Sequence, residues 1–213
     1  VRGAFNVEGN TINVIADFMS YFNMSGINAY ISINEKTTTG NVGTNGETEF
    51  HHILMKMLED GNGNPLELNI GEYKRFEYSF DMSSTFVEEM NDLEVSLWIQ
   101  DPVSREIYNS HFAYEYTDHC YPVQNLTADF SEDGSAINVA WEAPETGTPT
   151  GYNIYINGVL MEENYTSTSY TNNELATELY NMPKNHYVEV RTMYADDKSS
   201  VSLMDIFASG VNV

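Results

Sequence analysis

The sequence predicts an all-β protein made of two tandem β-sandwich domains, residues 1–120 and 121–213. Two observations support this prediction. Apolar and polar residues alternate with a period of two in short segments along most of the chain, which is the pattern of half-buried strands. In the second half, turn signals separate about seven such segments at spacings of roughly 8–12 residues. At 213 residues the chain is long enough to bury two hydrophobic cores.

Four alternating segments predict strands in the first domain. In each segment apolar side chains occupy every second position, so one face is buried and the other meets solvent. Asp101-Pro102 predicts a turn after the last segment, and residues 107–116 continue in extended, aromatic-rich sequence. The four segments run from Ile12 to Phe18, from Ile27 to Ile33, from Phe76 to Phe80 and from Leu93 to Ile99.

Three other segments of the first domain are less regular. Residues 51–58 are apolar and bounded by glycine, and their length favours a strand over a helix. Thr85, with Glu88 three residues later, has the spacing of a capping box, which predicts one short helix near residues 84–90. Residues 37–46 are rich in threonine, glycine and asparagine. They predict a long surface loop, a kind of segment that often carries binding.

The second domain has the same strand pattern with clearer turns. Residues 137–141 alternate, and Pro144 ends that strand because proline cannot donate to a ladder. Residues 152–156 form the next strand, after which Asn157-Gly158 predicts a type I′ hairpin, since both turn positions need positive φ. Further strands are expected in residues 159–161, 167–171, 187–194 and 200–213.

Three motifs of the second domain carry a family resemblance. They are Pro122 to Ala128, Ile137 to Pro144 and Gly151 to Gly158. Together they resemble a bacterial fibronectin type III domain of the kind attached to secreted and surface proteins. The resemblance implies an immunoglobulin-like sandwich with Trp141 in its core, and it implies no reaction.

One position departs from the pattern of that family. Its members usually carry a tyrosine two residues before a valine of the sixth strand, whereas this chain has His186 there, with Tyr187 next to it. A shift of one residue would turn Val188 and Val190 outward, which is costly. We therefore expect His186 to replace the aromatic ring in an unshifted strand.

The first domain carries a second resemblance, which spans residues 3–116. The segments from Phe50 to Leu58 and from Leu93 to Asp101, with Gly63 and Gly71 between them, resemble the β-sandwich of the twenty-eight-kilodalton outer membrane protein family. In that family the sandwich commonly follows a thioredoxin-like domain, but this chain has no Cys-x-x-Cys. The resemblance implies a surface or secreted bacterial protein with no established chemistry in the sandwich.

The composition restricts the partners. The chain has 32 acidic and 9 basic residues, a net charge of −23. Nucleic acid phosphates and anionic lipid surfaces repel such a chain, and self-repulsion favours a monomer. No apolar run reaches the roughly 18 residues of a membrane span. The single cysteine, Cys120, excludes internal disulfides and has no assigned role.

The sequence predicts no metal centre among its histidines and its cysteine. His51 and His52 are adjacent, so in a strand they face opposite sides and cannot easily bind one metal ion. His111, His119 and Cys120 lie closer together, but the paired spacings of a structural zinc site are missing. The simpler interpretation of His119 and Cys120 is a partly buried linker between the domains.

One loop is a weak candidate for calcium. Asp60, Asn62 and Asn64 place oxygen side chains at positions one, three and five of a loop, as an EF-hand does. Position six is Pro65 instead of glycine, and position twelve is Gly71 instead of glutamate, so the sharp turn and the bidentate ligand are lacking. A polar hairpin loop is the favoured interpretation, and no cofactor is expected.

No catalytic arrangement can be assembled from these motifs. A nucleophilic cysteine would need a base within hydrogen-bond reach and an oxyanion site, and the sequence indicates neither. Gly40 to Gly43 lacks the lysine and the following helix of a phosphate loop. A pair of hydrolytic carboxylates would need a cleft, of which two small sandwiches offer little. We expect no enzymatic activity.

Aromatic residues give the best indication of binding. The chain has 15 tyrosines, most of which should pack in sheets, while exposed ones would suit a protein or glycan partner. Trp98, Tyr114 and Tyr116 are weak candidates for binding residues. For Trp98 we favour packing over ligand contact.

Three functions fit the sequence. The first is an adhesion or protein-interaction module of a bacterial surface or secreted protein. The second is an accessory carbohydrate-binding segment of a larger secreted enzyme, and the third is a spacer. The expected location is extracellular or at the outer membrane surface, with lipid anchoring through a preceding N-terminal region as one form of attachment. A planar strip of exposed Trp and Tyr would favour glycan binding, and a mixed apolar and polar patch would favour a protein partner.

Overall fold

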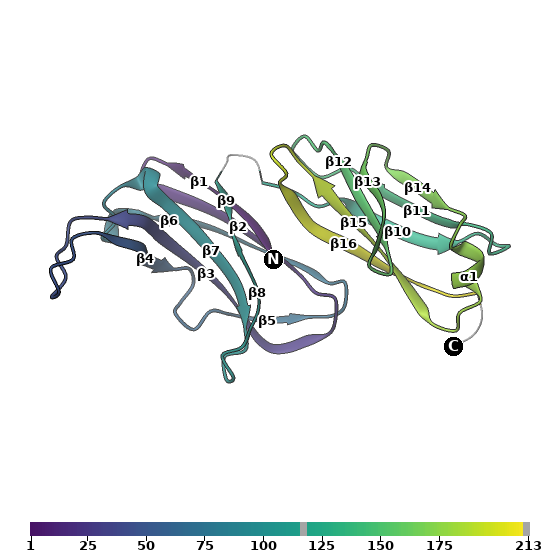
Figure 1. Cartoon of the computed structure of the whole chain (residues 1–213), viewed down its shortest axis with the longest axis horizontal. Coiled ribbons are helices and arrows are strands. Elements are labelled where there is room, and N and C mark those ends of the chain that lie inside the picture. Colours follow the sequence, from purple (N-terminus) through teal and green to yellow (C-terminus); the bar gives the residue numbers. More distant parts are fainter. Residues whose placement is uncertain (116–118, 211–213) are drawn as a thin grey trace. The chain divides into compact units, whose positions relative to one another are not determined.

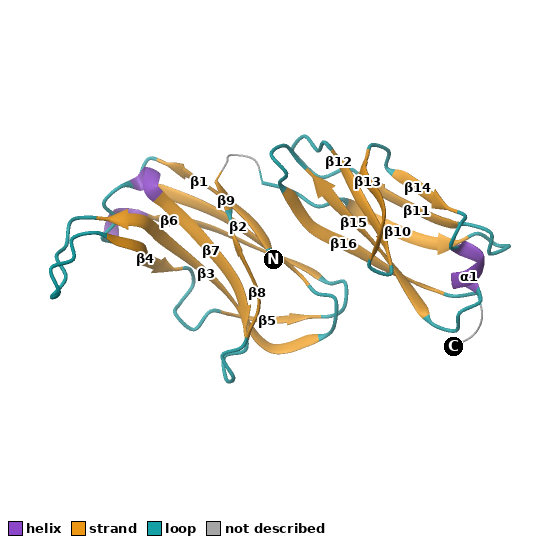
Figure 2. Ribbon diagram, in the orientation of Figure 1, coloured by secondary structure: helices purple, strands orange, loops and turns teal. Residues whose placement is uncertain are grey.

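The computed structural model describes residues 1–115 and 119–210, which are almost entirely β-strand (Figures 1 and 2). The chain divides into two compact units, Val1–His119 and Cys120–Val213. Each unit pairs two sheets into a β-sandwich with its own hydrophobic core. The predicted all-β fold of two tandem sandwiches is confirmed. Among the helices of the described residues, none is long and apolar enough to cross a membrane.

The first unit packs a four-stranded sheet against a five-stranded one. Its strands are antiparallel neighbours except for one short parallel pair, β1 with β9. The four-stranded sheet has the order β6 (Tyr73–Asp81), β2 (Thr11–Met19), β1 (Arg2–Glu8), β9 (Tyr114–Glu115). The other has the order β4 (Phe50–Met57), β3 (Met24–Thr38), β7 (Leu93–Gln100), β8 (Ile107–Phe112), and β5 (Asn64–Leu68) pairs with the first part of β3.

The core of the first unit follows the predicted alternation. The apolar set of β2, from Ile12 to Phe18, is no more than 1% exposed, and the corresponding sets of β3 and β7 are no more than 4% exposed. These side chains face each other across the sandwich and form one cluster. The strand predicted for residues 51–58 is confirmed as β4.

The prediction of a short helix near residues 84–90 is wrong. Two 3₁₀ turns, Met82–Ser84 and Met90–Asp92, lie on either side of an irregular segment. The carboxylate of Glu35, which is fully buried, accepts the backbone N–H groups of Glu88 and Glu89 at 2.5–3.1 Å. In the predicted capping box, the Thr85 side chain would have accepted the Glu88 N–H, but the Thr85 hydroxyl donates to the Met82 carbonyl oxygen instead. The tertiary contact therefore replaces the predicted capping box.

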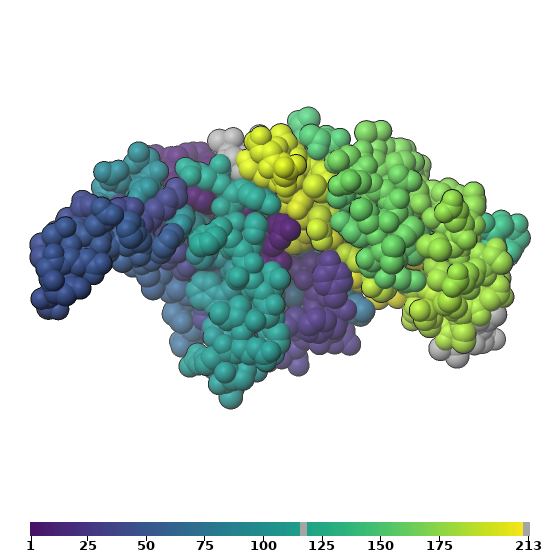
Figure 3. All heavy atoms as spheres, in the orientation of Figure 1, coloured from purple at the N-terminus to yellow at the C-terminus, as the bar shows by residue number. Residues whose placement is uncertain are grey.

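The loop expected at residues 37–46 is shifted along the chain. Thr37 and Thr38 belong to β3, where they pair with His51 and Phe50 of β4. The connection therefore spans residues 39–49 and projects from the first unit as a long hairpin (Figures 1 and 3). The β-propensity of the threonines extends the strand to Thr38, two residues before the first glycine of the loop, Gly40.

The second unit has seven strands in two sheets, the arrangement of a fibronectin type III-like sandwich. A short helix, Ala176–Tyr180, which the strand pattern did not predict, precedes β15. The three-stranded sheet has the order β10 (Gln124–Phe130), β11 (Ile137–Glu142), β14 (Ser169–Asn172). The four-stranded sheet has the order β13 (Val159–Tyr165), β12 (Gly151–Ile156), β15 (Asn185–Met193), β16 (Ser199–Ala208).

Trp141 lies in the core of the second unit, as expected. It is 5% exposed and packs edge-on against Tyr152, with ring centroids 5.3 Å apart. The predicted hairpin at Asn157-Gly158 is also present, with φ of 49° and 79°. The strand expected over residues 200–213 is confirmed as β16, Ser199–Ala208, and residues 211–213 lie outside the described part of the chain.

His186 replaces the family's tyrosine, as expected, while Val188 and Val190 remain fully buried. Its Nε2 donates to the carbonyl oxygen of Leu179 at 2.9 Å, and its Nδ1 accepts from the amide of Asn157 at 3.0 Å. The first bond reproduces the upstream backbone contact that a tyrosine makes at this corner. Burial lowers the pKa of His186 from its ordinary value of 6.5.

We predict that His186 makes the protein less stable in mild acid. The folded state favours the neutral imidazole, so protonation of His186 favours the unfolded chain. The contribution of His186 to the free energy of unfolding is fully present above the unfolded pKa of about 6.5, and it is lost as the pH falls through the lower pKa of the folded state. His186→Gln keeps a donor but cannot titrate, so its free energy of unfolding should change less between about pH 6.5 and 5. Parallel urea unfolding of the full chain at several pH values measures this difference, and identical pH profiles would contradict it.

We also predict that residues 120–213 fold alone, because their core is contained within the unit. Trp141 is the only tryptophan in this fragment, so its fluorescence should report a single cooperative transition in urea. Trp141→Ala, followed by circular dichroism, should cost about 3–5 kcal/mol. A broad, non-cooperative transition of the unsubstituted fragment would refute its independence.

Candidate functional site

The histidines and the cysteine do not gather into a metal centre. Among the described residues, no three His, Cys, Asp or Glu side chains lie close enough together to hold a metal ion. His52 instead contacts the carboxylate of Glu94 at 2.6 Å, and His51 contacts Glu49 at 3.1 Å. Cys120 is buried and takes part in no disulfide.

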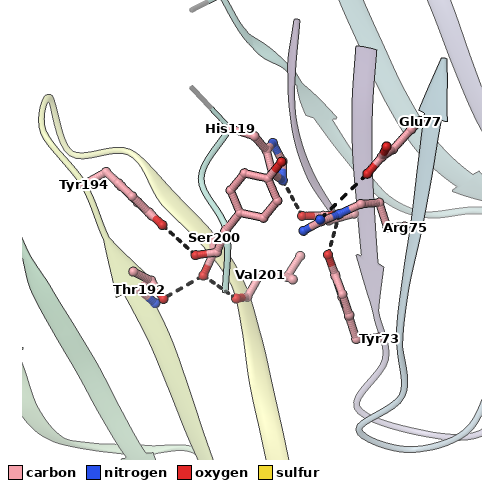
Figure 4. Close-up of polar contacts among 10 residues, drawn as sticks. Tyr73, Arg75, Glu77, His119, Thr192, Tyr194, Ser200 and Val201 are labelled. Carbon is pink, nitrogen blue, oxygen red and sulfur yellow. Dashed lines mark hydrogen bonds and ion pairs between the residues drawn. The ribbon is translucent and has the colours of Figure 1, made fainter. Parts of the chain in front are cut away.

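A buried polar cluster forms around Asp17 of β2 (Figure 4). Asp17 is fully buried, and its carboxylate accepts from the Tyr73 hydroxyl at 2.8 Å, Arg75 Nε at 2.9 Å and His119 Nε2 at 2.5 Å. Burial and the charge of Asp17 raise the pKa of Tyr73. The period-two pattern from Ile12 to Phe18 predicts that Asp17, on the alternate positions, faces solvent, and the sequence predicts that His119 lies in a partly buried linker. Both are buried, so the cluster is a structural tie between β2, β6 and the end of the first unit.

A second polar tie lies within the second unit (Figure 4). The hydroxyl of Ser200 accepts from the Thr192 N–H at 3.2 Å and donates to the Val201 carbonyl oxygen at 2.6 Å. The hydroxyl of Tyr194 donates to the Tyr121 carbonyl oxygen at 2.7 Å, and burial raises the pKa of Tyr194. The Thr192–Ser200 bond joins β15 to β16, and the Tyr194 bond fastens the start of the second unit to the residue that follows β15.

Side-chain oxygen atoms of the candidate calcium loop accept hydrogen bonds from within the first unit. Asp60 Oδ1 accepts the Asn62 N–H at 2.6 Å, which closes a local turn. The side chain of Asn64 is buried, and its Oδ1 accepts from the Tyr78 hydroxyl at 3.2 Å. The amide oxygen of Asn64 is thus engaged within the sandwich.

The aromatic candidates pack against neighbouring rings. Trp98 is half-buried on the outer face of β7, where it stacks on Tyr30 of β3 with centroids 5.0 Å apart and planes 4° apart. Tyr114 is half-buried and meets His111 edge-on at 5.1 Å. Burial lowers the pKa of His111 to about 4, with a smaller contribution from Arg2. Tyr116 lies outside the described residues.

A groove in the first unit, which aromatic counting did not reveal, combines apolar and polar side chains. Phe86, in the irregular β6–β7 segment, is 93% exposed, and Leu54 of β4 is 55% exposed. They border a hollow of about 350 Å³, hereafter the β4 groove. Its lining comprises Thr38, Asn41, Ile53, Leu54, Met55, Phe86 and Glu88.

The polar wall of the β4 groove is held in place by Glu88. Its two carboxylate oxygens accept the backbone N–H groups of Thr39 and Gly40, each at 2.7 Å. A Cβ atom at Gly40 would lie 2.5 Å from Glu88 Oε1, so a larger residue at this position would displace the carboxylate. The start of the β3–β4 loop is thus fixed beside Phe86, and part of the predicted contact loop does border the groove.

Comparisons with known proteins add little on function. No protein-family model matches the chain, and none of the curated proteins matches it. Among solved structures, it is similar to an Fn3-like protein from Clostridium thermocellum, at 19% identity over 41% of this chain and 90% of the other, with a TM-score of 0.34. It is also similar to fibronectin(III)-like modules of CbhA from the same organism, at 12% identity over 98% and 90%, with a TM-score of 0.32.

A third similarity is to the Endo-D glycoside hydrolase domain from Streptococcus pneumoniae R6. Identity is 9%, the match covers all of this chain and 36% of the other, and the TM-score is 0.37. This chain therefore spans about a third of that structure. TM-scores this low carry no argument about function, so the assignment depends on the residues themselves.

We predict that Asp17→Asn destabilises the first unit by about 3–5 kcal/mol, because it leaves the buried Arg75 contact without its anion. Glu77→Gln is the matched control, since Glu77 is 64% exposed and lies 3.9 Å from Arg75. Its effect should be small, as for other exposed pairs. Denaturant unfolding of the two variants measures the contrast, and equal losses would show that the cluster does not depend on Asp17.

Proposed function

We propose that this chain is a non-catalytic segment of a secreted or surface protein whose first unit binds a protein partner through the β4 groove. The single observation that carries the proposal is the mixed character of the groove. Phe86, which is 93% exposed, and Leu54 line the groove together with the polar side chains of Asn41 and Glu88. Exposed apolar groups rimmed by polar ones are typical of protein interaction sites.

The exposure of the other aromatic side chains favours a protein partner over a glycan partner. Glycan binding would call for a planar strip of exposed Trp and Tyr rings. Trp98 is half-buried, and one face of its ring is covered by Tyr30. The three most exposed rings of the described residues, Phe86, Phe112 and Phe22, lack the polar edge of Trp or Tyr. Tyr21 and Tyr108 are 46% and 42% exposed, and they belong to different elements, the segment after β2 and β8.

The domain assignment and the location belong to the same proposal. The first unit is interpreted as a sandwich resembling the outer membrane protein family, and the second as a fibronectin type III-like module that presents it. An extracellular or outer-membrane location and a role in adhesion agree with both resemblances. The net charge of −23 supports a monomer that does not bind nucleic acid.

The proposal predicts that binding to a protein depends on Phe86. Arrays of purified secreted proteins and of glycans, probed with the full chain, should give signals on the protein array. Phe86→Ala should weaken them about tenfold or more, as truncation of a central interface residue does. Phe112→Ala is the matched control, because Phe112 is 59% exposed on β8 but does not line the groove.

Two results would contradict the proposal. Glycan binding that Trp98→Ala abolishes, with the fold verified by thermal melting, would make the chain an accessory carbohydrate-binding segment. An absence of binding on both arrays would leave the role of a spacer as the remaining function of the chain.

A further inference from the structure

The β4 groove runs along the free edge of a strand. Three consecutive residues of β4, Ile53, Leu54 and Met55, line it. Ile53 pairs with Glu35 and Leu54 with Asn34, so the side chains of Ile53 and Leu54 point to opposite faces of the sheet, and a β-bulge follows at Met55. A hollow that touches both Ile53 and Leu54 therefore follows the strand edge instead of one face. Among the described strands, β4 pairs only with β3. Its other edge therefore presents backbone N–H and C=O groups beside the groove.

This open edge is short because it is protected at both ends. His52 has a positive φ of 54°, which interrupts regular pairing before Ile53. Lys56 turns over the ring of Phe80, 5.0 Å from its centroid, and a charged side chain at an edge discourages further pairing. The stretch from Ile53 to Met55 lies between these two residues, and it is the part of β4 that lines the groove.

The surroundings of the groove are acidic. Residues 38–57 and 82–92, which border it, contain one basic residue, Lys56. They contain five acidic residues, Glu47, Glu49, Glu88, Glu89 and Asp92. A second copy of this chain would bring the same acidic segments to the same edge, so self-pairing is electrostatically opposed. Charge complementarity selects a cationic occupant.

We infer that the β4 groove binds an extended cationic segment of a partner protein, which adds as a short strand to β4 and places an apolar side chain between Ile53 and Phe86. This inference rests on the proposed function and specifies the kind of partner. Main-chain hydrogen bonds to a sheet edge supply affinity in this mode, and alternate side chains supply specificity. The basic residues of the segment face the acidic border.

Synthetic peptides test the inference on the full chain. The first probe alternates lysine and valine. The second carries glutamate in place of lysine, and the third is the lysine peptide with N-methyl groups on alternate residues, which keeps the charge but removes the donors of one edge. Titrations at about 0.15 M ionic strength, where the Debye length is about 8 Å, limit non-specific attraction.

We expect the lysine–valine peptide to bind, with amide chemical-shift changes concentrated at Ile53 to Met55. N-methylation and Phe86→Ala should each weaken binding about tenfold, whereas Phe112→Ala should leave it unchanged. The glutamate peptide should not bind. Equal binding of the methylated and unmethylated lysine peptides would overturn the inference, as would shifts spread over acidic residues elsewhere.

The failure of this inference can be told apart from the failure of the proposed function. If proteins bind in a Phe86-dependent way but the peptides do not, the groove takes a folded partner, and only the strand-addition inference falls. If sedimentation shows Phe86-dependent dimers without any peptide, the occupant is a second copy, and the cationic-partner inference falls.

Discussion

Burial of one apolar face of each sheet against the sheet opposite is the interaction on which both units depend. In the first unit, Ile12, Ile31 and Leu97 are completely buried between the sheets, and Ile137, Ile154 and Val190 play the same part in the second. Fully burying such a side chain contributes about 1.5–3 kcal/mol. Because side chains alternate, this requirement also fixes the strand register. This requirement does not fix the residues at the outer faces of the sheets, at their edges and in the connections.

Two carboxylates, the buried Glu35 and the exposed Glu88, organise those connections in the first unit. Glu35 faces the core side of β3 and holds the irregular β6–β7 segment through two backbone N–H groups. Glu88 of that segment then holds the start of the β3–β4 loop. Together, the two carboxylates hold Phe86 beside β4 and so form the groove. A buried charge is costly unless it is hydrogen-bonded, and Glu35 meets this requirement with main-chain donors.

The groove gives a physical basis for assigning a binding role to a protein without a catalytic centre. Its apolar side chains can exclude water, its strand edge can donate and accept hydrogen bonds, and its border carries net negative charge. The remaining polar clusters have structural roles. Asp17 and His119 are buried and tie together elements of the first unit, and His186 closes a corner of the second.

The sequence by itself determined the all-β fold, the core residues and the replacement of a tyrosine by His186, because these follow from a period of two that each strand carries locally. It could not determine the groove. Phe86 and Leu54 are 32 residues apart in the chain. Their proximity arises from the backbone contacts of Glu35 and Glu88, which no local pattern encodes. The same reason explains the helix wrongly expected near residues 84–90 and the burial of Asp17, whose partners come from β6 and residue 119. Tertiary structure decided these features because hydrogen bonds between distant segments outweighed local propensity.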